Sequence, residues 1–575
     1  MTGFARTLPF GATLLDGGRT RFRLWAPKER QVSVAIDRGT PLAMVPATDG
    51  WFELEASCEA GATYFYRLES GQSVPDPAAR AQADDVHGPS VVVDPSAYAW
   101  QHPGWQGRPW AETILYELHT GLFGGFKGVQ AELKRLADLG VTAVELMPIN
   151  DFPGKRNWGY DGVLPFAPDR AYGTPDELKA LIDTAHGLGL MVFLDVVYNH
   201  FGPDGNYLGL YAPQFFREDV KTPWGPAIDF RQPPVRRFFI ENALYWLEEY
   251  RFDGLRFDAV HAIADQSWLD EMAAEIRRTV TPRRQVHLVL EHDGNEASHL
   301  RKGYDAQWND DAHHVMHVLL TGEGDGYYSD YATQPAEKLA RALSEGFVYQ
   351  GDPSPYRKGE PRGTPSADLA PTSFVVFLQN HDQIGNRPFG DRLTTLADPD
   401  ALMAAVAVQL LAPSIPLIFM GEETFARTPF QFFTDYRGEL ADAVREGRKR
   451  EFASFTGFGG KDIPDPNAPE TFERCRLEPG DSDFYRALLK LRHELIVPRL
   501  KGTRALDARV LGTAAMLVRW RLGDGAILGI AANLGRAAVA FAPPSGVPIL
   551  ETREKAVADG QLAGHATVVF IESPA

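Results

Sequence analysis

The chain of 575 residues has little cysteine and less positive than negative charge. Cys58 and Cys475 are its only cysteines, which excludes a disulfide framework and predicts two reduced thiols. Its 58 Lys and Arg residues are outnumbered by 76 Asp and Glu residues, giving a formal net charge of −18. This charge argues against a nucleic-acid backbone or an anionic membrane as partner, and a neutral ligand fits better.

Secretory and membrane-spanning segments are also not predicted. The first residues, MTGFARTLPFGATLL, are interrupted by Pro9 and Gly11 and show no cleavage site of a signal peptide. Residues 401–420, ALMAAVAVQLLAPSIPLIFM, carry no charge and are long enough to cross a bilayer. Because Pro413 and Pro416 divide this run, it predicts a buried helix, a turn and a strand. We therefore expect a cytoplasmic protein.

The pattern of the chain changes twice. Residues 1–98 contain short alternating runs such as TRFRLWAP (20–27), which predict an N-terminal β-sandwich. Residues 99–497 alternate strand-like with helical runs, which predicts a (β/α)₈ TIM barrel with a short insertion at 201–233, a doubly wound sheet being the alternative. Residues 498–575 predict a C-terminal all-β sandwich domain. The expected barrel strands are 113–119, 141–149, 190–197, 253–259, 286–292, 304–309, 373–380 and 415–421.

Polar residues gather where these predicted strands end, which is where the active site of such a barrel lies. Three carboxylates, Asp258, Glu291 and Asp382, end the fourth and fifth strands and follow the seventh. We expect all three to converge on one mouth. The other polar candidates at these ends are Asp195, Asn199, His200, Arg256, His261, Asn380 and His381.

Paired carboxylates in different protonation states are what cleavage of an acetal needs. Arg256, two residues from Asp258 on a strand, is expected to keep that carboxylate ionised, as a nucleophile requires. Glu291 follows the apolar run VHLVL, so burial and like charge are expected to raise its pKa, as a general acid requires. The two carboxylates should then lie about 5 to 5.5 Å apart. A metal site is the alternative, but these His residues lack short metal-ligand spacings and no EF-hand pattern occurs, so no metal is predicted.

Aromatic residues are expected beside the carboxylates, because pyranose rings stack on flat side chains. The loop FPGKRNWGYDG (152–162) offers Trp158 and Tyr160, which flank Gly159. We expect both to line the site, with core packing as the alternative for each.

Four segments resemble glycoside hydrolase family 13, the α-amylase family: DVVYNH (195–200), GLRFDAVH (254–261), the strand ending in Glu291, and QNHD (379–382). The resemblance covers the whole chain and implies a retaining glycosidase with a TIM barrel. It also implies roles for the three carboxylates: Asp258 would be the nucleophile, Glu291 the acid and base, and Asp382 the third catalytic carboxylate. Arg256, His200, His381 and Tyr160 would contact the sugar.

Further segments resemble the trehalose-releasing members of this family, among them NWGYDGV, HFGPDGNYL, AQWNDDAHHVMHVLLTGE and NHDQIGNR. Such enzymes cut the α-1,4 bond next to the terminal trehalose of a malto-oligosyltrehalose and release trehalose and a maltodextrin. The resemblance implies no cofactor, and a malto-oligosyltrehalose synthase that supplies the substrate without a stable complex. In WNDDAHH (308–314) we expect Asp310, Asp311 or His314 to contact the leaving disaccharide.

Some features depart from the family pattern, and other activities stay open. GLFGGFKG (121–128) stands where a turn with Thr and Pro is expected, Glu291 is followed by His292 and Asp293, and the acidic calcium loop of many amylases is missing. A glycogen branching or debranching enzyme and a general α-amylase are alternatives within the family. The alternative of another class is a catalytically silent carbohydrate-binding module, which the three carboxylates and Arg256 argue against.

Overall fold

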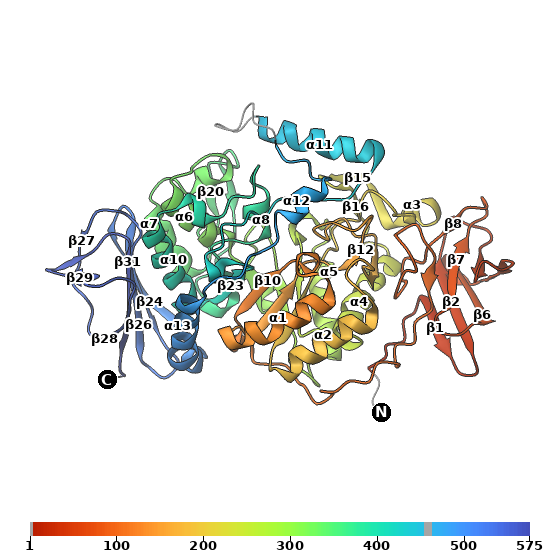
Figure 1. Cartoon of the computed structure of the whole chain (residues 1–575), viewed down its shortest axis with the longest axis horizontal. Coiled ribbons are helices and arrows are strands. Elements are labelled where there is room, and N and C mark those ends of the chain that lie inside the picture. Colours follow the sequence, from red (N-terminus) through yellow and green to blue (C-terminus); the bar gives the residue numbers. More distant parts are fainter. Residues whose placement is uncertain (1–3, 454–462, 575) are drawn as a thin grey trace.

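A computed structural model describes residues 4–453 and 463–574, with a closed parallel barrel between two β domains (Figure 1). The eight strands follow the order of the chain, and the last pairs with the first. The predicted barrel is therefore confirmed. Its strands are β10 (Leu115–Leu118), β11 (Ala143–Leu146), β14 (Met191–Val196), β17 (Gly254–Phe257), β18 (His287–Leu290), β19 (Ala306–Trp308), β22 (Phe374–Val376) and β23 (Ile415–Phe419).

Helices cover the barrel, and their ends follow from the sequence. The second helix begins with a capping box, in which the Thr174 side chain accepts from Glu177 N–H and the Glu177 side chain accepts from Thr174 N–H, followed by Pro175. A (β/α)₈ barrel is expected to have an α-helix after each strand. This expectation fails after β18, because only the 3₁₀ turn His299–Arg301 lies between β18 and β19. The main helices are α1 (Phe126–Leu139), α2 (Pro175–Gly187), α4 (Pro233–Glu248), α5 (Ser267–Thr279), α6 (Asp310–Thr321), α7 (Pro335–Glu345) and α10 (Pro399–Leu411).

The charge-free run 401–420 forms α10 and β23, joined by a turn at 412–414. Nearly every residue of α10 is buried, which explains a helix that is apolar on all sides. Among the residues that the structure describes, no helix is both long and apolar enough to cross a membrane.

Three antiparallel hairpins are inserted between the barrel elements. The first joins β12 (Asn150–Asp151) to β13 (Leu164–Pro168), and its loop carries Trp158 and Tyr160. The second, β15 (Phe216–Thr222) and β16 (Gly225–Ile228), lies within the predicted insertion. The third joins β20 (Asp352–Ser354) to β21 (Glu360–Arg362) after α7.

The N-terminal β domain consists of two sheets with a shared core. Buried Arg80 joins it to the barrel through an ion pair of 3.1 Å with Glu249 at the end of α4. One sheet contains β1 (Gly11–Leu15), β2 (Arg19–Trp25), β6 (Trp51–Ser57) and β5 (Val45–Pro46). The other contains β4 (Leu42–Ala43), β3 (Ser33–Ile36), β7 (Thr63–Arg67), β8 (Ser73–Val74) and β9 (Ser90–Val91).

The C-terminal β domain lies at the opposite end of the molecule, against α7 and α10 (Figure 1). The Thr567 hydroxyl donates to the carbonyl of Ala404 in α10 at 2.8 Å, and Trp520 Nε1 donates to Leu343 in α7 at 3.2 Å. Its larger sheet contains β24 (Arg504–Gly512), β25 (Ala515–Arg521), β26 (Ile527–Asn533), β31 (Ala566–Glu572) and β28 (Val547–Glu551). A small sheet contains β27 (Val539–Ala540), β30 (Gln561–Leu562) and β29 (Val557–Ala558).

Candidate active site

Arg256 of β17 is the centre of the site, and its side chain is 0% exposed. Its Nη1 lies 2.6 Å from Asp195 Oδ2 and 2.9 Å from Asp258 Oδ1, and its Nη2 lies 2.8 Å from Glu291 Oε2. The guanidinium carbon lies 4.1 Å from the centroid of the buried Trp308 ring of β19. One guanidinium thus holds the carboxylates at the ends of the fourth and fifth strands together.

A cavity of about 350 Å³ opens beside these carboxylates. Glu291 and Asp382 line it together with His261, which is exposed. Asp258 is not one of the lining residues, and its side chain is 11% exposed. The rest of the lining comes from α6, from the segment after it and from the loop of the third hairpin: Asp310, His314, Tyr327, Asp330, Tyr331, Tyr356, Arg357 and Arg362, with Asp293, Gln383 and Asn386.

The protonation expected of the two carboxylates is wrong for the free site. Burial and the charge of Glu291 raise the pKa of Asp258 well above its usual value, although Arg256 opposes them. For Glu291, burial is outweighed by the charge of Arg256 and by the N–H of Ala259, so its pKa is lowered. The difference arises because Arg256 contacts both groups, whereas the Ala259 N–H donates only to Glu291, at 2.8 Å. Ala259 adopts this position in the left-handed region, with φ 41°.

Asn380 supports the third carboxylate and does not face the cavity. Its side-chain oxygen caps α8 (His381–Gly385), accepting from the N–H groups of Asp382 at 2.9 Å and Gln383 at 3.3 Å. Asn380 is buried and its side chain serves as this cap, while its binding of substrate stays a prediction. His381, next in the chain, lies between Glu117 and Asp382, with its Nε2 3.5 Å from Asp382 Oδ2.

The two aromatic residues of the 152–162 loop have different surroundings. Tyr160 is partly exposed, donates to Asp195 Oδ2 at 2.6 Å, and stacks on His381 at a centroid distance of 5.0 Å. Trp158 is buried, stacks on Phe430 at 5.2 Å and donates to the carbonyl of Gln431 at 3.0 Å. Trp158 is therefore a core residue, and the expectation that it lines the site is wrong.

The residues after the third barrel strand hold other site residues in place. Asp195 is buried and its Oδ2 contacts Arg256 and Tyr160, so it positions these two residues, while its direct contact with substrate stays a prediction. Asn199 is also buried against His200, at 3.0 Å from Nδ1, and does not reach the cavity as expected. The Nε2 of His200 lies 3.0 Å from the carbonyl of Tyr160, and burial lowers the pKa of His200 to about 4.

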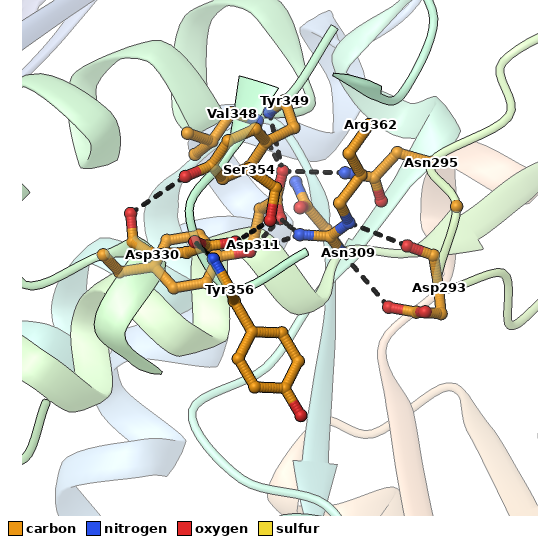
Figure 2. Close-up of polar contacts among 12 residues, drawn as sticks. Asp293, Asn295, Asn309, Asp311, Asp330, Val348, Tyr349, Ser354, Tyr356 and Arg362 are labelled. Carbon is orange, nitrogen blue, oxygen red and sulfur yellow. Dashed lines mark hydrogen bonds and ion pairs between the residues drawn. The ribbon is translucent and has the colours of Figure 1, made fainter. Parts of the chain in front are cut away.

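The aspartates at the start of α6 have opposite surroundings. Asp310 lines the cavity, as does His314 one turn later, whereas Asp311 is 0% exposed. Figure 2 shows Asp311 among its partners: it accepts from Arg362 Nη1 at 2.9 Å and from the Val348 N–H at 2.7 Å. Its other donors are the hydroxyl of Tyr331, the amide of Asn295 and the N–H of Tyr349. The expectation that Asp311 contacts the disaccharide is therefore wrong.

Several residues of the site were not anticipated from the sequence. Glu117 and Trp308 lie within apolar strand runs. Glu117 could have been found from the sequence, because it is a carboxylate within an apolar run, as Asp258 is. Trp224, in the turn between β15 and β16, is 46% exposed and stacks on His200 at 5.0 Å and 11°. Tyr356 was likewise missed, because hairpin insertions carry no periodic pattern.

The described residues contain no group of three or more His, Cys, Asp or Glu side chains arranged to hold a metal ion.

Comparisons with known proteins agree with this geometry. Residues 80–209 match the model of the alpha amylase catalytic domain, and residues 503–569 match a domain of unknown function, DUF3459. A malto-oligosyltrehalose trehalohydrolase of Deinococcus radiodurans is 44% identical over 89% of this chain and 89% of its own length. That of Saccharolobus solfataricus is 40% identical over 85% of this chain and 87% of its own length.

Among solved structures, a Salmonella typhimurium protein described as a candidate alpha amylase is 45% identical, with a TM-score of 0.93. The match covers 99% of this chain and 100% of that one. Identity of this level over nearly the whole length shows that the chain belongs to the malto-oligosyltrehalose trehalohydrolase family, within the α-amylase group of glycoside hydrolases.

Proposed function

We propose that this chain is a retaining glycosidase that hydrolyses the α-1,4-glucosidic bond next to the terminal trehalose of a malto-oligosyltrehalose. Its products are trehalose and a shortened maltodextrin. The observation that carries this proposal is the pair of carboxylates, Asp258 and Glu291, which contact one guanidinium, with Glu291 lining the cavity. This pair can supply both a nucleophile and a proton donor.

The reaction proceeds in two steps. Asp258 attacks C1 of the glucosyl unit while Glu291 gives its proton to the glycosidic oxygen, so that the C1–O bond breaks and trehalose leaves. Glu291 then removes a proton from water, which attacks C1 and releases Asp258, and the maltodextrin keeps its α configuration. Asp382, His381 and His200 hold the hydroxyls of the sugar, and Tyr160 stacks beneath its ring. His261, which lines the cavity, is a further candidate for contact with the substrate.

The proposed mechanism needs a proton on Glu291 and an ionised Asp258 when substrate is bound. In the free site, the lowered pKa belongs to Glu291 and the raised one to Asp258. A glycosidic oxygen placed against Glu291 accepts a hydrogen bond only from its protonated form, and the developing positive charge at C1 favours ionised Asp258. Bound substrate therefore reverses the preference of the free enzyme.

Asp310 and His314 are suited to recognise the leaving trehalose, since both line the cavity beside Glu291. Trehalose has no reducing end and bends sharply, so polar groups placed for its second ring would stay unpaired against a straight glucan. Each unpaired buried group costs about 1–3 kcal/mol. Alanine at Asp310 or His314 should thus reduce the cleavage of capped substrate more than that of uncapped maltodextrin. Equal losses would contradict this assignment.

The function is tested by incubating the enzyme with a trehalose-capped malto-oligosaccharide and with its uncapped counterpart, and measuring trehalose by chromatography. We expect rapid trehalose release from the capped substrate and slow hydrolysis of the other. Equal rates would indicate a general α-amylase, and new α-1,6 linkages without trehalose would indicate a branching enzyme.

The setting of the enzyme follows from its substrate. A malto-oligosyltrehalose synthase would supply the capped glucan and act before this chain without a stable complex. A cytoplasmic location agrees with Cys58 and Cys475, which are buried free thiols. We also propose the division into domains at residues 1–98, 99–497 and 498–575.

A further inference from the structure

Two glutamates are buried side by side in the barrel wall behind His381. Glu117 of β10 and Glu145 of β11 are register partners in adjacent parallel strands, and each is 1% exposed. Oε1 of Glu117 contacts Nδ1 of His381, whereas Oε2 of Glu117 and both oxygens of Glu145 make no hydrogen bond to a described residue. Because buried carboxylates without partners are costly, their presence indicates a role beyond packing.

We propose that Glu117 is a positioning residue for the reaction, which holds His381 from behind as an imidazolium whose Nε2–H points to Asp382 and the sugar. This inference rests on the proposed function, in which His381 donates to a sugar hydroxyl. Glu117 itself lies behind the imidazole and does not touch substrate.

The contacts around the imidazole fix its orientation. Nδ1 faces the carboxylate of Glu117, and Nε2 lies 3.5 Å from Asp382 Oδ2. Tyr160 stacks on the ring at 5.0 Å with an interplanar angle of 25°, and Trp158 meets it edge-on at 5.6 Å and 87°. An imidazolium matches this arrangement, because it presents one N–H to each of the two carboxyl groups.

The charges that face His381 favour the same state. Burial disfavours the imidazolium, but the charges of Asp382 and Glu117 outweigh it and raise the pKa of His381 to about 9. Burial and the charge of Glu117 also raise the pKa of Glu145 well above its usual value, which favours its neutral form. The charged or titratable groups around the ring are Glu117 of β10 and His119 just after it, Glu145 of β11, Asp195 of β14, Arg256 of β17, Glu291 just after β18, Tyr160, and Asp382 of α8.

A hydrogen bond from a charged donor is about twice as strong as one from a neutral donor. An imidazolium held in this orientation therefore binds the sugar hydroxyl more tightly than a neutral ring. Since its charge is lost as the pH rises through about 9, Glu117 protects this contact on the alkaline side of the pH range.

Glu117→Gln tests the inference, with Glu145→Gln as the matched control. Both changes replace a buried acid by its amide in neighbouring positions of the barrel, but the carboxyl oxygens of Glu145 make no hydrogen bond to His381. The full chain is labelled with ¹⁵N-histidine, and the NMR signal of His381 is identified as the one that is missing in His381→Asn. The titration of this signal is followed by NMR, and the pH profile of kcat/KM is measured for the same variants. Circular dichroism verifies that each variant is folded.

We expect Glu117→Gln to lower the titration midpoint of His381 by about one pH unit or more, and to move the alkaline limb of kcat/KM with it. Glu145→Gln should leave the midpoint in place. An unchanged midpoint in Glu117→Gln, or equal shifts in both variants, would overturn the inference. If Glu117→Gln does not fold, Glu117→Asp is used instead, because the shorter side chain moves the carboxylate away from His381. An unchanged titration midpoint of His381 in Glu117→Asp would also overturn the inference. Because the NMR titration needs no substrate, its outcome is separate from whether the chain releases trehalose.

Discussion

Nη2 of Arg256 lies 2.8 Å from Oε2 of Glu291, so the proposed general acid forms an ion pair before substrate arrives. The lowered pKa of Glu291 follows from this contact and from the N–H of Ala259. The same contacts disfavour the protonated form that a general acid needs, so the ion pair with Arg256 has to weaken when substrate binds if Glu291 is to donate its proton.

The roles of the two carboxylates can be separated with maltosyl fluoride, because fluoride leaves without protonation. Glu291→Ala should hydrolyse the natural substrate at least about 10²-fold more slowly, yet still release a burst of about one fluoride per enzyme molecule. Asp258→Ala should give no burst, because it lacks the nucleophile. A fluoride electrode measures both bursts. A burst from Asp258→Ala would contradict the assigned roles.

The neighbouring aspartates of α6 should differ in their effect on stability. Asp311→Ala leaves buried Arg362 without the carboxylate that it contacts at 2.9 Å, and we expect a loss of about 3–5 kcal/mol. Asp310→Ala removes a group from the cavity lining, and its effect should be within about 0.5 kcal/mol.

Urea denaturation of the two variants and of the unchanged chain measures this difference. Similar midpoints for the two variants would show that the contacts of Asp311 drawn in Figure 2, among them that with Arg362, do not stabilise the fold.

Trp224 offers a flat, exposed surface beside the site, since its ring stacks on His200 at 5.0 Å. If glucan stacks on this ring, Trp224→Ala should raise KM about 2- to 10-fold, equivalent to about 0.5–1.5 kcal/mol, and leave kcat nearly unchanged. Its melting temperature should not fall, because the side chain is 46% exposed. Trp224→Phe keeps a flat ring and should retain most of the affinity. A KM that does not respond to alanine would remove Trp224 from the substrate path.

The barrel could be predicted because each strand is a short apolar run followed by polar residues, and this pattern depends little on distant contacts. Asp258, Glu291 and Asp382 could be identified from the same pattern, because a charge at the end of a buried strand is costly unless it is solvated, paired or used in chemistry.

The direction in which a side chain faces could not be predicted. Asp310 and Asp311 are adjacent and identical in type, yet one lines the cavity and the other binds Arg362 from the distant β21 strand. The sequence predicts that Trp158 lines the site together with Tyr160, but Trp158 packs in the core, where it stacks on Phe430. Such differences depend on residues far away in the sequence, which a local pattern does not contain. The pKa order of Asp258 and Glu291 was missed because the backbone turn at Ala259 is not encoded in residue spacing.

The central claim is that Asp258 forms a covalent bond with the sugar while Glu291 serves as acid and base. Its most direct test is mass spectrometry of peptides from enzyme trapped with a 5-fluoro-α-glucosyl fluoride, which slows the second step. We expect one fluorinated hexosyl group on the peptide that contains Asp258. A group attached to Glu291 or Asp382, or no adduct together with products of inverted configuration, would contradict the account.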